Sequence, residues 1–135
     1  MVKVHALEEK IFPDPWPYEA FKEQLSSEGW SGIIAEIGSE IIGYTCFFIN
    51  SNEAHITNMA VAQDYRRKSV AKQLLDNILL IVSKYECEFV LLEVRSSNIE
   101  AIEFYKKHGF TFLYLRPEYY RKPVEDALVF VRYFE

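Results

Sequence analysis

The stretch that most constrains the fold runs from residue 54 to residue 94. A β-rich run, a basic turn, an amphipathic helix pattern and a second β-rich run follow one another there. Apolar residues recur at helical spacing between the two β-rich runs, at Val70, Leu74, Ile78 and Val82. A strand, a helix and a strand in this order form a crossover connection, whose helix packs on a face of the sheet. The sequence therefore predicts a mixed sheet covered by helices.

The flanking segments extend this crossover to a mixed α/β (α+β) fold of about six strands and about four helices. The 135 residues fit a single domain, residues 1–135. Ser97 followed by Glu100 is a capping-box pattern, which predicts a helix from Asn98 to Gly109. Predicted helices cover residues 4–11, 18–25, 70–85 and 98–109, and predicted strands cover residues 32–37, 41–49, 54–61, 89–94, 111–115 and 127–133.

Composition excludes several classes of protein. Half of the residues are apolar and 16% are aromatic, which is too many for a disordered chain. No apolar run approaches the roughly 18 residues needed to cross a bilayer, so we expect no membrane segment. The N-terminus lacks the pattern of an export signal, so we expect the protein to be cytoplasmic. The net charge of −5 argues against nucleic acid as a partner.

The cysteines and histidines have no spacing typical of a metal site or a disulfide framework. We expect Cys46 and Cys87 to be reduced thiols in the core, since free cysteine is among the most buried residue types. His5, His55 and His108 are scattered along the chain, and we assign none of them to a metal or to a catalytic base.

The basic turn at residues 66–71 is the first candidate binding site. The N-terminus of a helix offers unpaired backbone N–H groups and a partial positive charge, which together bind pyrophosphate. The alternative is that Arg66, Arg67 and Lys68 form a solvated charged turn. The chain has no phosphate loop of the GxxxxGK type, so ATP and GTP are not supported as ligands.

Three features around this turn follow one another in a characteristic order. They are Asn58-Met59-Ala60-Val61, the basic turn, and the run from Leu92-Glu93-Val94-Arg95 through Asn98 to Phe104-Tyr105 and Gly109-Phe110. As a set they resemble the GNAT acetyltransferase superfamily, and within it the RimI type, which acetylates protein N-termini. The resemblance implies transfer of acetyl from acetyl-CoA to an amine.

The resemblance also implies how coenzyme A is held, between the end of the strand at residues 54–61, the basic turn and the start of the helix at Asn98. A backbone N–H near Val61 is then a candidate to polarise the thioester carbonyl. The residues implied in cofactor binding are Met59, Ala60, Val61, Arg66, Arg67, Lys68, Ser69, Val70, Ala71 and Asn98.

The chain departs from the family pattern at two places. Ser69 replaces the usual glycine of the turn. In the family the glycine, which has no side chain, lets the backbone approach phosphate or adopt a positive φ. The strand with which the family usually opens has no counterpart in the sequence. An uncovered sheet edge needs a partner or charged residues, so a homodimer is a further expectation.

Two residues are candidates for catalysis. By resemblance Glu93 is the general base that takes a proton from the attacking ammonium, within an apolar strand; the alternative is an ion pair with Arg95 on the same strand face. By resemblance the Tyr105 hydroxyl lies beside the sulfur and acts as general acid; the alternative is a core tyrosine. Asn98 and Tyr105 are two helical turns apart, about 10 Å along one face.

The acceptor side is implied by aromatic residues on two connections. Phe12, Pro13 and Trp16 resemble a family helix connection near the substrate mouth, and Tyr119 and Tyr120 resemble a loop that covers a peptide N-terminus. Packing is the alternative role for these aromatics. The expected acceptor is the α-amino group of a protein N-terminus, with a ribosomal protein beginning with alanine as the suggested substrate. The alternatives are a small amine or lysine side chain as acceptor, and a non-catalytic acyl-CoA-binding module.

Overall fold

The computed structural model describes residues 2–12, 15 and 17–134. Within them the elements follow the order α1 (Val2–Ile11), α2 (Tyr18–Leu25), β1 (Trp30–Ile37), β2 (Glu40–Asn50), β3 (Glu53–Val61), η1 (Gln63–Tyr65), α3 (Val70–Lys84), β4 (Phe89–Arg95), α4 (Ile99–Lys107), β5 (Thr111–Arg121) and β6 (Val124–Tyr133).

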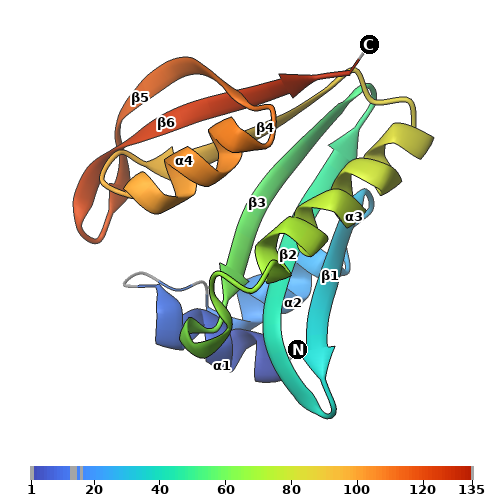
Figure 1. The fold of residues 1–135 in the computed structure, drawn as a ribbon, viewed down its shortest axis with the longest axis vertical. Helices are drawn as coiled ribbons and strands as arrows, with labels where there is room; N and C mark the ends of the chain where they lie inside the picture. The colour runs from blue at the N-terminus through green and yellow to red at the C-terminus, as the bar shows by residue number, and fades with distance from the viewer. Residues whose placement is uncertain (1, 13–14, 16, 135) are drawn as a thin grey trace.

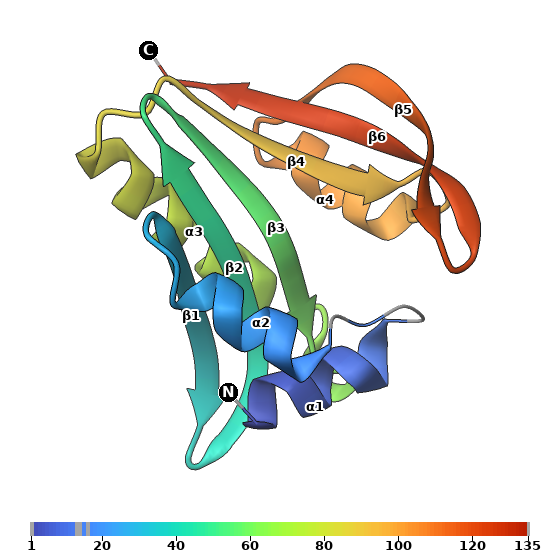
Figure 2. The ribbon, with the colours of Figure 1, turned by 180° about the vertical axis from the view of Figure 1, so that it is seen from behind.

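The six strands form one mixed sheet in the order β1-β2-β3-β4-β6-β5. The β3–β4 pair, which the α3 crossover joins, is parallel, and the other pairs are antiparallel. Figure 1 shows α3 and α4 in front of the sheet, and Figure 2 shows α1 and α2 on the opposite face. The mixed α+β sheet with four helices confirms the predicted fold.

A separate apolar cluster lies on each face of the sheet. The larger one joins α3 and α4 to β3, β4 and β6, with Leu75, Ile78 and Phe130 at most 1% exposed. The smaller one joins α1 and α2 to β2 through Phe21 and Tyr44. Burial of these apolar side chains stabilises the packing of the helices on both faces of the sheet. The gain in free energy is about 25 cal/mol for each Å² of apolar surface removed from water. The sheet is thereby held as a rigid platform between two helical layers.

Several predicted boundaries differ from those in the structure, and two of the differences have a clear local reason. The side chain of Asn98, rather than that of Ser97, caps α4, because its Oδ1 accepts the Ala101 N–H at 3.1 Å. The predicted strand over residues 111–115 continues to Arg121 as β5, since Tyr120 pairs with Glu125 of β6 beyond a register shift. The aromatic pair at residues 119 and 120 therefore belongs to a hairpin rather than to a loop.

Candidate active site

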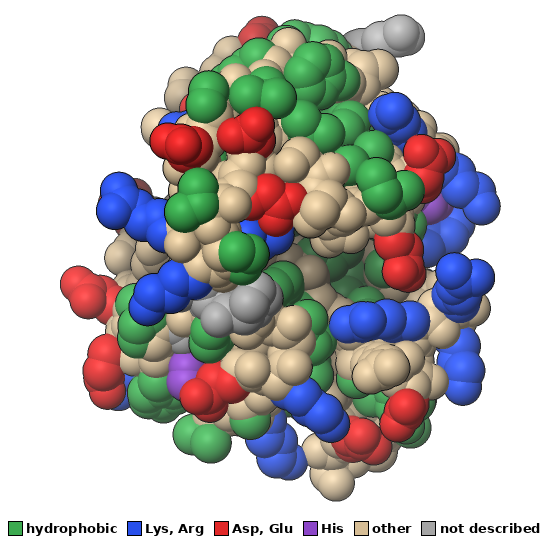
Figure 3. Space-filling model, turned by 90° about the vertical axis from the view of Figure 1, so that its left-hand side faces the viewer, with side chains coloured by type: hydrophobic (Ala, Val, Ile, Leu, Met, Phe, Trp, Pro, Cys, Tyr) green, Lys and Arg blue, Asp and Glu red, His purple; other side chains and the backbone are tan. Residues whose placement is uncertain are grey.

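β3 and β4 pair over only four residues and then separate. Their parallel register runs from Glu53 opposite Phe89 to Ile56 opposite Leu92, yet β3 continues to Val61 and β4 to Arg95. We call the space between these unpaired ends the notch. Figure 1 shows the two strands diverging, and Figure 3 shows a surface hollowed near its middle, with Lys and Arg side chains beside the hollow. The predicted residues Met59, Ala60 and Val61 lie on the part of β3 that borders the notch.

The basic turn connects this end of β3 to α3. Ser69 adopts the left-handed conformation, with φ 66° and ψ 15°. The first helical bond runs from the Gln73 N–H to the Ser69 carbonyl, 3.1 Å, so the amides of Val70 and Ala71 precede it. The family glycine is therefore replaced by a serine that keeps the backbone conformation typical of glycine.

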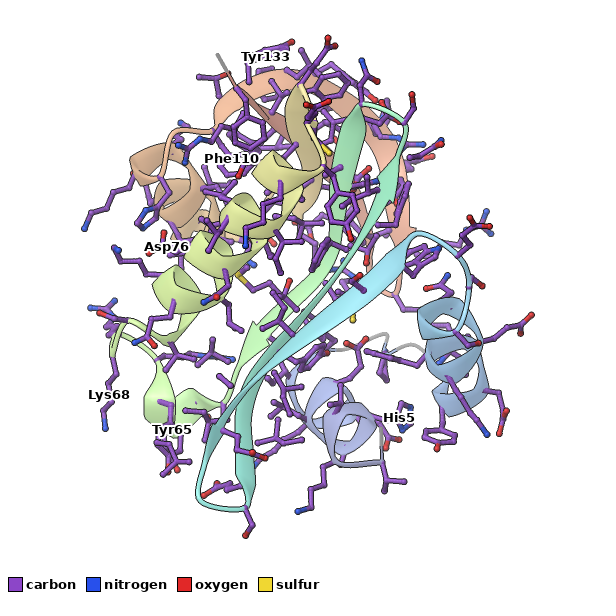
Figure 4. All side chains as sticks on the ribbon, turned by 90° about the vertical axis from the view of Figure 1, so that its right-hand side faces the viewer. His5, Tyr65, Lys68, Asp76, Phe110 and Tyr133 are labelled. Carbon is purple, nitrogen blue, oxygen red and sulfur yellow. The ribbon has the colours of Figure 1, made fainter. Side chains whose placement is uncertain are left out.

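The side chains of the turn point in different directions. Arg66 folds back, and its Nε donates to the Val61 carbonyl at 3.1 Å. Lys68 lies 5.6 Å from the ring centre of Tyr65, and Figure 4 shows both on the turn before α3, with Lys68 directed outward. Arg66 is thus tied to the end of β3, whereas Lys68 is positioned to meet a ligand from solvent.

Glu93 lies on β4 directly after the last pair with β3. One carboxylate oxygen lies 2.6 Å from His55 Nε2 on β3, and the other accepts from Arg116 NH1 on β5 at 3.3 Å. The carboxylate therefore lies among polar partners rather than in the apolar surroundings that the strand sequence predicts. The alternative pair with Arg95 is wrong, because Arg95 pairs with Glu125, 3.3 Å away.

His55 is a candidate functional residue that the sequence prediction missed. Its place beside Glu93 depends on the β3–β4 register, which sets Leu91 opposite His55. Local hydrophobic periodicity does not encode that long-range register. An imidazole in hydrogen-bond contact with a carboxylate places two groups that can exchange a proton side by side, 2.6 Å apart.

Tyr105 reaches the notch from α4, on the side opposite to Glu93. Its side chain is only 8% exposed, and its hydroxyl lies 3.6 Å from the Met59 sulfur on β3. Burial raises the pKa of this phenol above 10.0, with a smaller electrostatic contribution from the nearby Tyr120 phenol. The hydroxyl therefore keeps its proton at neutral pH. At the start of the same helix, the Asn98 Oδ1 is used by the cap, which leaves Nδ2 to donate to a ligand.

The hairpin formed by residues 116–126 brings Tyr119 and Tyr120 beside Glu93. We call it the acceptor hairpin, after the role that the sequence resemblance implies for these tyrosines. The Arg116 guanidinium lies 4.5 Å from the centre of the Tyr119 ring, and the Arg95 guanidinium 4.2 Å from that of Tyr120. Burial first, and the charge of Glu93 second, raise the pKa of both phenols. The two tyrosines are thus neutral and close to the candidate base, and each ring lies against an arginine guanidinium.

The predicted residues of the α1–α2 connection are described only in part. Phe12 is partly buried against the smaller apolar cluster, and Pro13 and Trp16 lie outside the described residues. Glu8 of α1, which the sequence prediction missed, is 2% exposed and accepts from the Tyr44 hydroxyl and from Asn58 Nδ2, the latter at 3.1 Å. This buried carboxylate fixes α1 on β2 and β3 near the notch.

Other kinds of chemistry find little support in the described residues. Cys46 and Cys87 are buried free thiols, and burial raises the pKa of Cys46 to about 12, so neither is a thiolate nucleophile at neutral pH. The described part of the chain contains no cluster of three or more His, Cys, Asp or Glu side chains that suits a metal ion. Nor does it contain a helix with the length and apolar character to span a bilayer.

Comparison with known proteins identifies the family to which a chain with this site belongs. The model of the acetyltransferase (GNAT) family matches residues 1–110. An N-alpha-acetyltransferase of Saccharolobus solfataricus is 30% identical over 145 positions, which cover 98% of this chain and 84% of that protein.

Two solved structures are similar over nearly the whole chain. The ribosomal-protein-S18-alanine N-acetyltransferase from Escherichia coli has a TM-score of 0.90 at 25% identity, covering 98% of this chain and 86% of that one. Ard1 from Thermoplasma volcanium has a TM-score of 0.92 at 25% identity, covering 99% of this chain and 90% of that one.

A mixed sheet that splits between two parallel strands, with a helix N-terminus beside the split, is the architecture of an acyl-CoA-dependent N-acetyltransferase. This chain belongs to the acetyltransferase (GNAT) family, whose members use acetyl-CoA. The resemblance seen in the sequence, including the relation to the RimI type and N-alpha-acetyltransferases, is confirmed.

Proposed function

We propose that this N-acetyltransferase transfers the acetyl group of acetyl-CoA to the α-amino group of a protein N-terminus. The observation that carries the proposal is the Glu93–His55 pair, 2.6 Å apart at the notch and beside the tyrosines of the acceptor hairpin. In this proposal the peptide terminus and the thioester bound in the notch meet beside this pair. N-alpha acetylation by the Saccharolobus relative supports the same choice of acceptor.

The residues around the notch fit acetyl-CoA. The turn at Ser69 leaves the amides of Val70 and Ala71 ahead of the first helical bond, and Arg67 and Lys68 add positive charge. These groups are suited to the pyrophosphate, with Asn98 Nδ2 as a donor to the pantetheine amide and the free edge of β3 at Met59 to Val61 beside the arm. When bound there, acetyl-CoA supplies an activated thioester.

Proton transfer is then divided between the two sides of the notch. Glu93, together with His55, accepts the proton that the amine loses as its nitrogen bonds to the acetyl carbon. Tyr105 donates its phenol proton to the sulfur as the carbon–sulfur bond breaks. The proton gained by one side equals the proton lost by the other, and both groups are restored by exchange with water.

The pKa of the acceptor amine favours an α-amino group over a lysine side chain. An α-amino group has a pKa of about 8, whereas that of lysine is about 10.4, so far less of a lysine is neutral at pH 7. An α-amino group therefore needs less help from a general base than a lysine side chain does. An N-terminal alanine on a ribosomal protein is the first acceptor to test, since the Escherichia coli neighbour acts on such a terminus.

The test combines cofactor binding with acceptor-dependent turnover. Calorimetric titration gives the affinity for acetyl-CoA, and thiol release is then followed with Ala-, Ser- and Met-starting peptides. The same peptides with blocked N-termini are the matched controls. Release that requires a free N-terminus supports the proposal. Binding without release, or equal release from blocked peptides that contain lysine, contradicts it.

A further inference from the structure

One arginine holds the tip of the acceptor hairpin. Arg95, at the end of β4, donates from NH1 to the Pro123 carbonyl at 3.0 Å and from NH2 to the Lys122 carbonyl at 3.2 Å. Its NH1 also lies 3.3 Å from Glu125 Oε1, and its guanidinium stacks on the Tyr120 ring at 4.2 Å. The fork of a guanidinium suits this set of acceptors, whereas an ammonium presents a single point charge.

The second oxygen of Glu125 holds the start of α4. Its Oε2 accepts from the Ser97 N–H at 2.6 Å and from the Ser96 hydroxyl at 3.2 Å, immediately before the Asn98 cap. Hydrogen bonds from Ser97 above all hold the pKa of Glu125 below its usual range. The carboxylate is therefore ionised at neutral pH and joins two parts of the site with charge-assisted bonds.

These contacts link the element proposed to hold acetyl-CoA to the element proposed to hold the acceptor. Arg95 positions Tyr120 in the hairpin, and Glu125 connects Arg95 to the helix start that carries Asn98. A second tie runs in parallel, since the Ser96 N–H donates to the Asp126 carbonyl at 3.0 Å. The start of α4 and the hairpin are therefore joined by both side-chain and backbone hydrogen bonds.

We propose that Arg95 and Glu125 are positioning residues that couple the two binding sites, so that acetyl-CoA at the start of α4 orders the acceptor hairpin and raises the affinity for the peptide. The coupling is reciprocal, because the peptide must raise the affinity for the cofactor by the same factor. This coupling rests on the proposed function, since it needs a peptide acceptor at the hairpin.

The first arm of the test measures the coupling without turnover. Peptide affinity is determined by calorimetry with and without coenzyme A, which carries no acetyl group to transfer. We expect coenzyme A to tighten peptide binding about fivefold or more in the unmodified protein, and less than about twofold in Glu125→Gln. Arg95→Lys, which keeps the charge but loses the fork, is expected to fall in between. Lys122→Gln is the matched control, because it changes the charge at the same tip but its side chain does not contact Arg95 or Glu125.

The second arm does not depend on a peptide. Hydrogen exchange of residues 117–126, followed by mass spectrometry, is expected to slow when coenzyme A binds the unmodified protein and the Lys122→Gln control, and to stay fast in Glu125→Gln.

Steady-state kinetics with the peptide form a third arm. Glu125→Gln is expected to raise the peptide KM at least about fivefold and to change kcat by less than about twofold.

The outcomes separate this inference from the proposed function. If coupling and slowed exchange persist in Glu125→Gln, the proposed coupling through Arg95 and Glu125 is wrong, even if the enzyme acetylates N-termini. If no peptide binds the unmodified protein, the proposed function fails, and the exchange arm alone decides whether coenzyme A orders the hairpin through Glu125. Circular dichroism of each variant identifies loss of folding, in which case Arg95→Lys replaces Glu125→Gln as the deciding variant.

Discussion

The conformation of Ser69 makes its replacement by glycine the most informative single change in the cofactor turn. With φ at 66°, Ser69 occupies a region that costs a residue with a side chain about 1 to 2 kcal/mol. Glycine has no such cost. However, glycine makes the unfolded chain more flexible, which lowers the free energy of unfolding by about 0.5 to 1 kcal/mol. The serine makes no side-chain cap bond that would be lost. The expected net effect is stabilisation by about 0.5 to 1 kcal/mol.

Urea unfolding and calorimetric titration with coenzyme A test this expectation together. For a chain of this size the stabilisation corresponds to a rise in Tm of about 2 to 4 °C. Affinity for coenzyme A is expected to be preserved or tightened, because glycine lets the turn approach phosphate more closely. Glu86→Gly is the matched control: Glu86 also has a positive φ, 59°, but lies after α3, so stability should rise without any change in affinity.

Two results would refute the reasoning. Destabilisation of Ser69→Gly by more than about 1 kcal/mol would mean that the serine side chain supports the turn despite its left-handed conformation. A loss of affinity for coenzyme A greater than about tenfold, with unchanged stability, would mean that the hydroxyl itself donates to the ligand.

Further changes test the proposed proton path and the buried tyrosines. Glu93→Gln is expected to lower kcat about 100-fold near neutral pH without weakening acetyl-CoA binding, and the deficit should shrink above a pH of about 8; a constant deficit would exclude Glu93 as base. His55→Asn is expected to lower kcat about tenfold but to add little to Glu93→Gln, because the two act as a unit; additive effects would separate them. Tyr105→Phe should depress kcat more than cofactor affinity, and an effect on affinity alone would make Tyr105 a packing residue. Burial raises the pKa of Tyr44 and Tyr105 above 10.0, so their contribution to stability is full below pH 10 and is lost as the pH rises. Each then removes up to about 1.4 kcal/mol per pH unit, and thermal unfolding above about pH 10 should have a shallower pH dependence in Tyr44→Phe; equal slopes would contradict this.

Local signals in the sequence account for most of the fold. The helical spacing of Val70, Leu74, Ile78 and Val82 predicted α3, and its position between two strands predicted the crossover that creates the notch. The left-handed conformation of Ser69 was one of two reasons that the family pattern offered for a glycine at this position, and the structure shows it for the serine. These features depend on residues close together in the chain, whose periodicity is visible without a structure.

The partners across the sheet could not be read in the same way. His55 and Glu93 are separated by 38 residues and meet only through the register of two parallel strands. Arg116 and Arg95 likewise find their carboxylates on other strands. The burial of Glu8 was partly visible, since position 8 shares a helical face with Val4, Leu7 and Ile11, but its partners on β2 and β3 were not.

The most direct test of the central claim offers two amines to the enzyme in one molecule. A peptide that begins with alanine and carries an internal lysine is incubated with acetyl-CoA and the enzyme, and fragment-ion mass spectrometry locates the acetyl group. We predict acetylation of the α-amino group, with the lysine unmodified and the reaction about 100-fold slower in Glu93→Gln at neutral pH. Acetylation of the lysine, or of both amines at equal rates, would contradict the assignment of this site to protein N-termini.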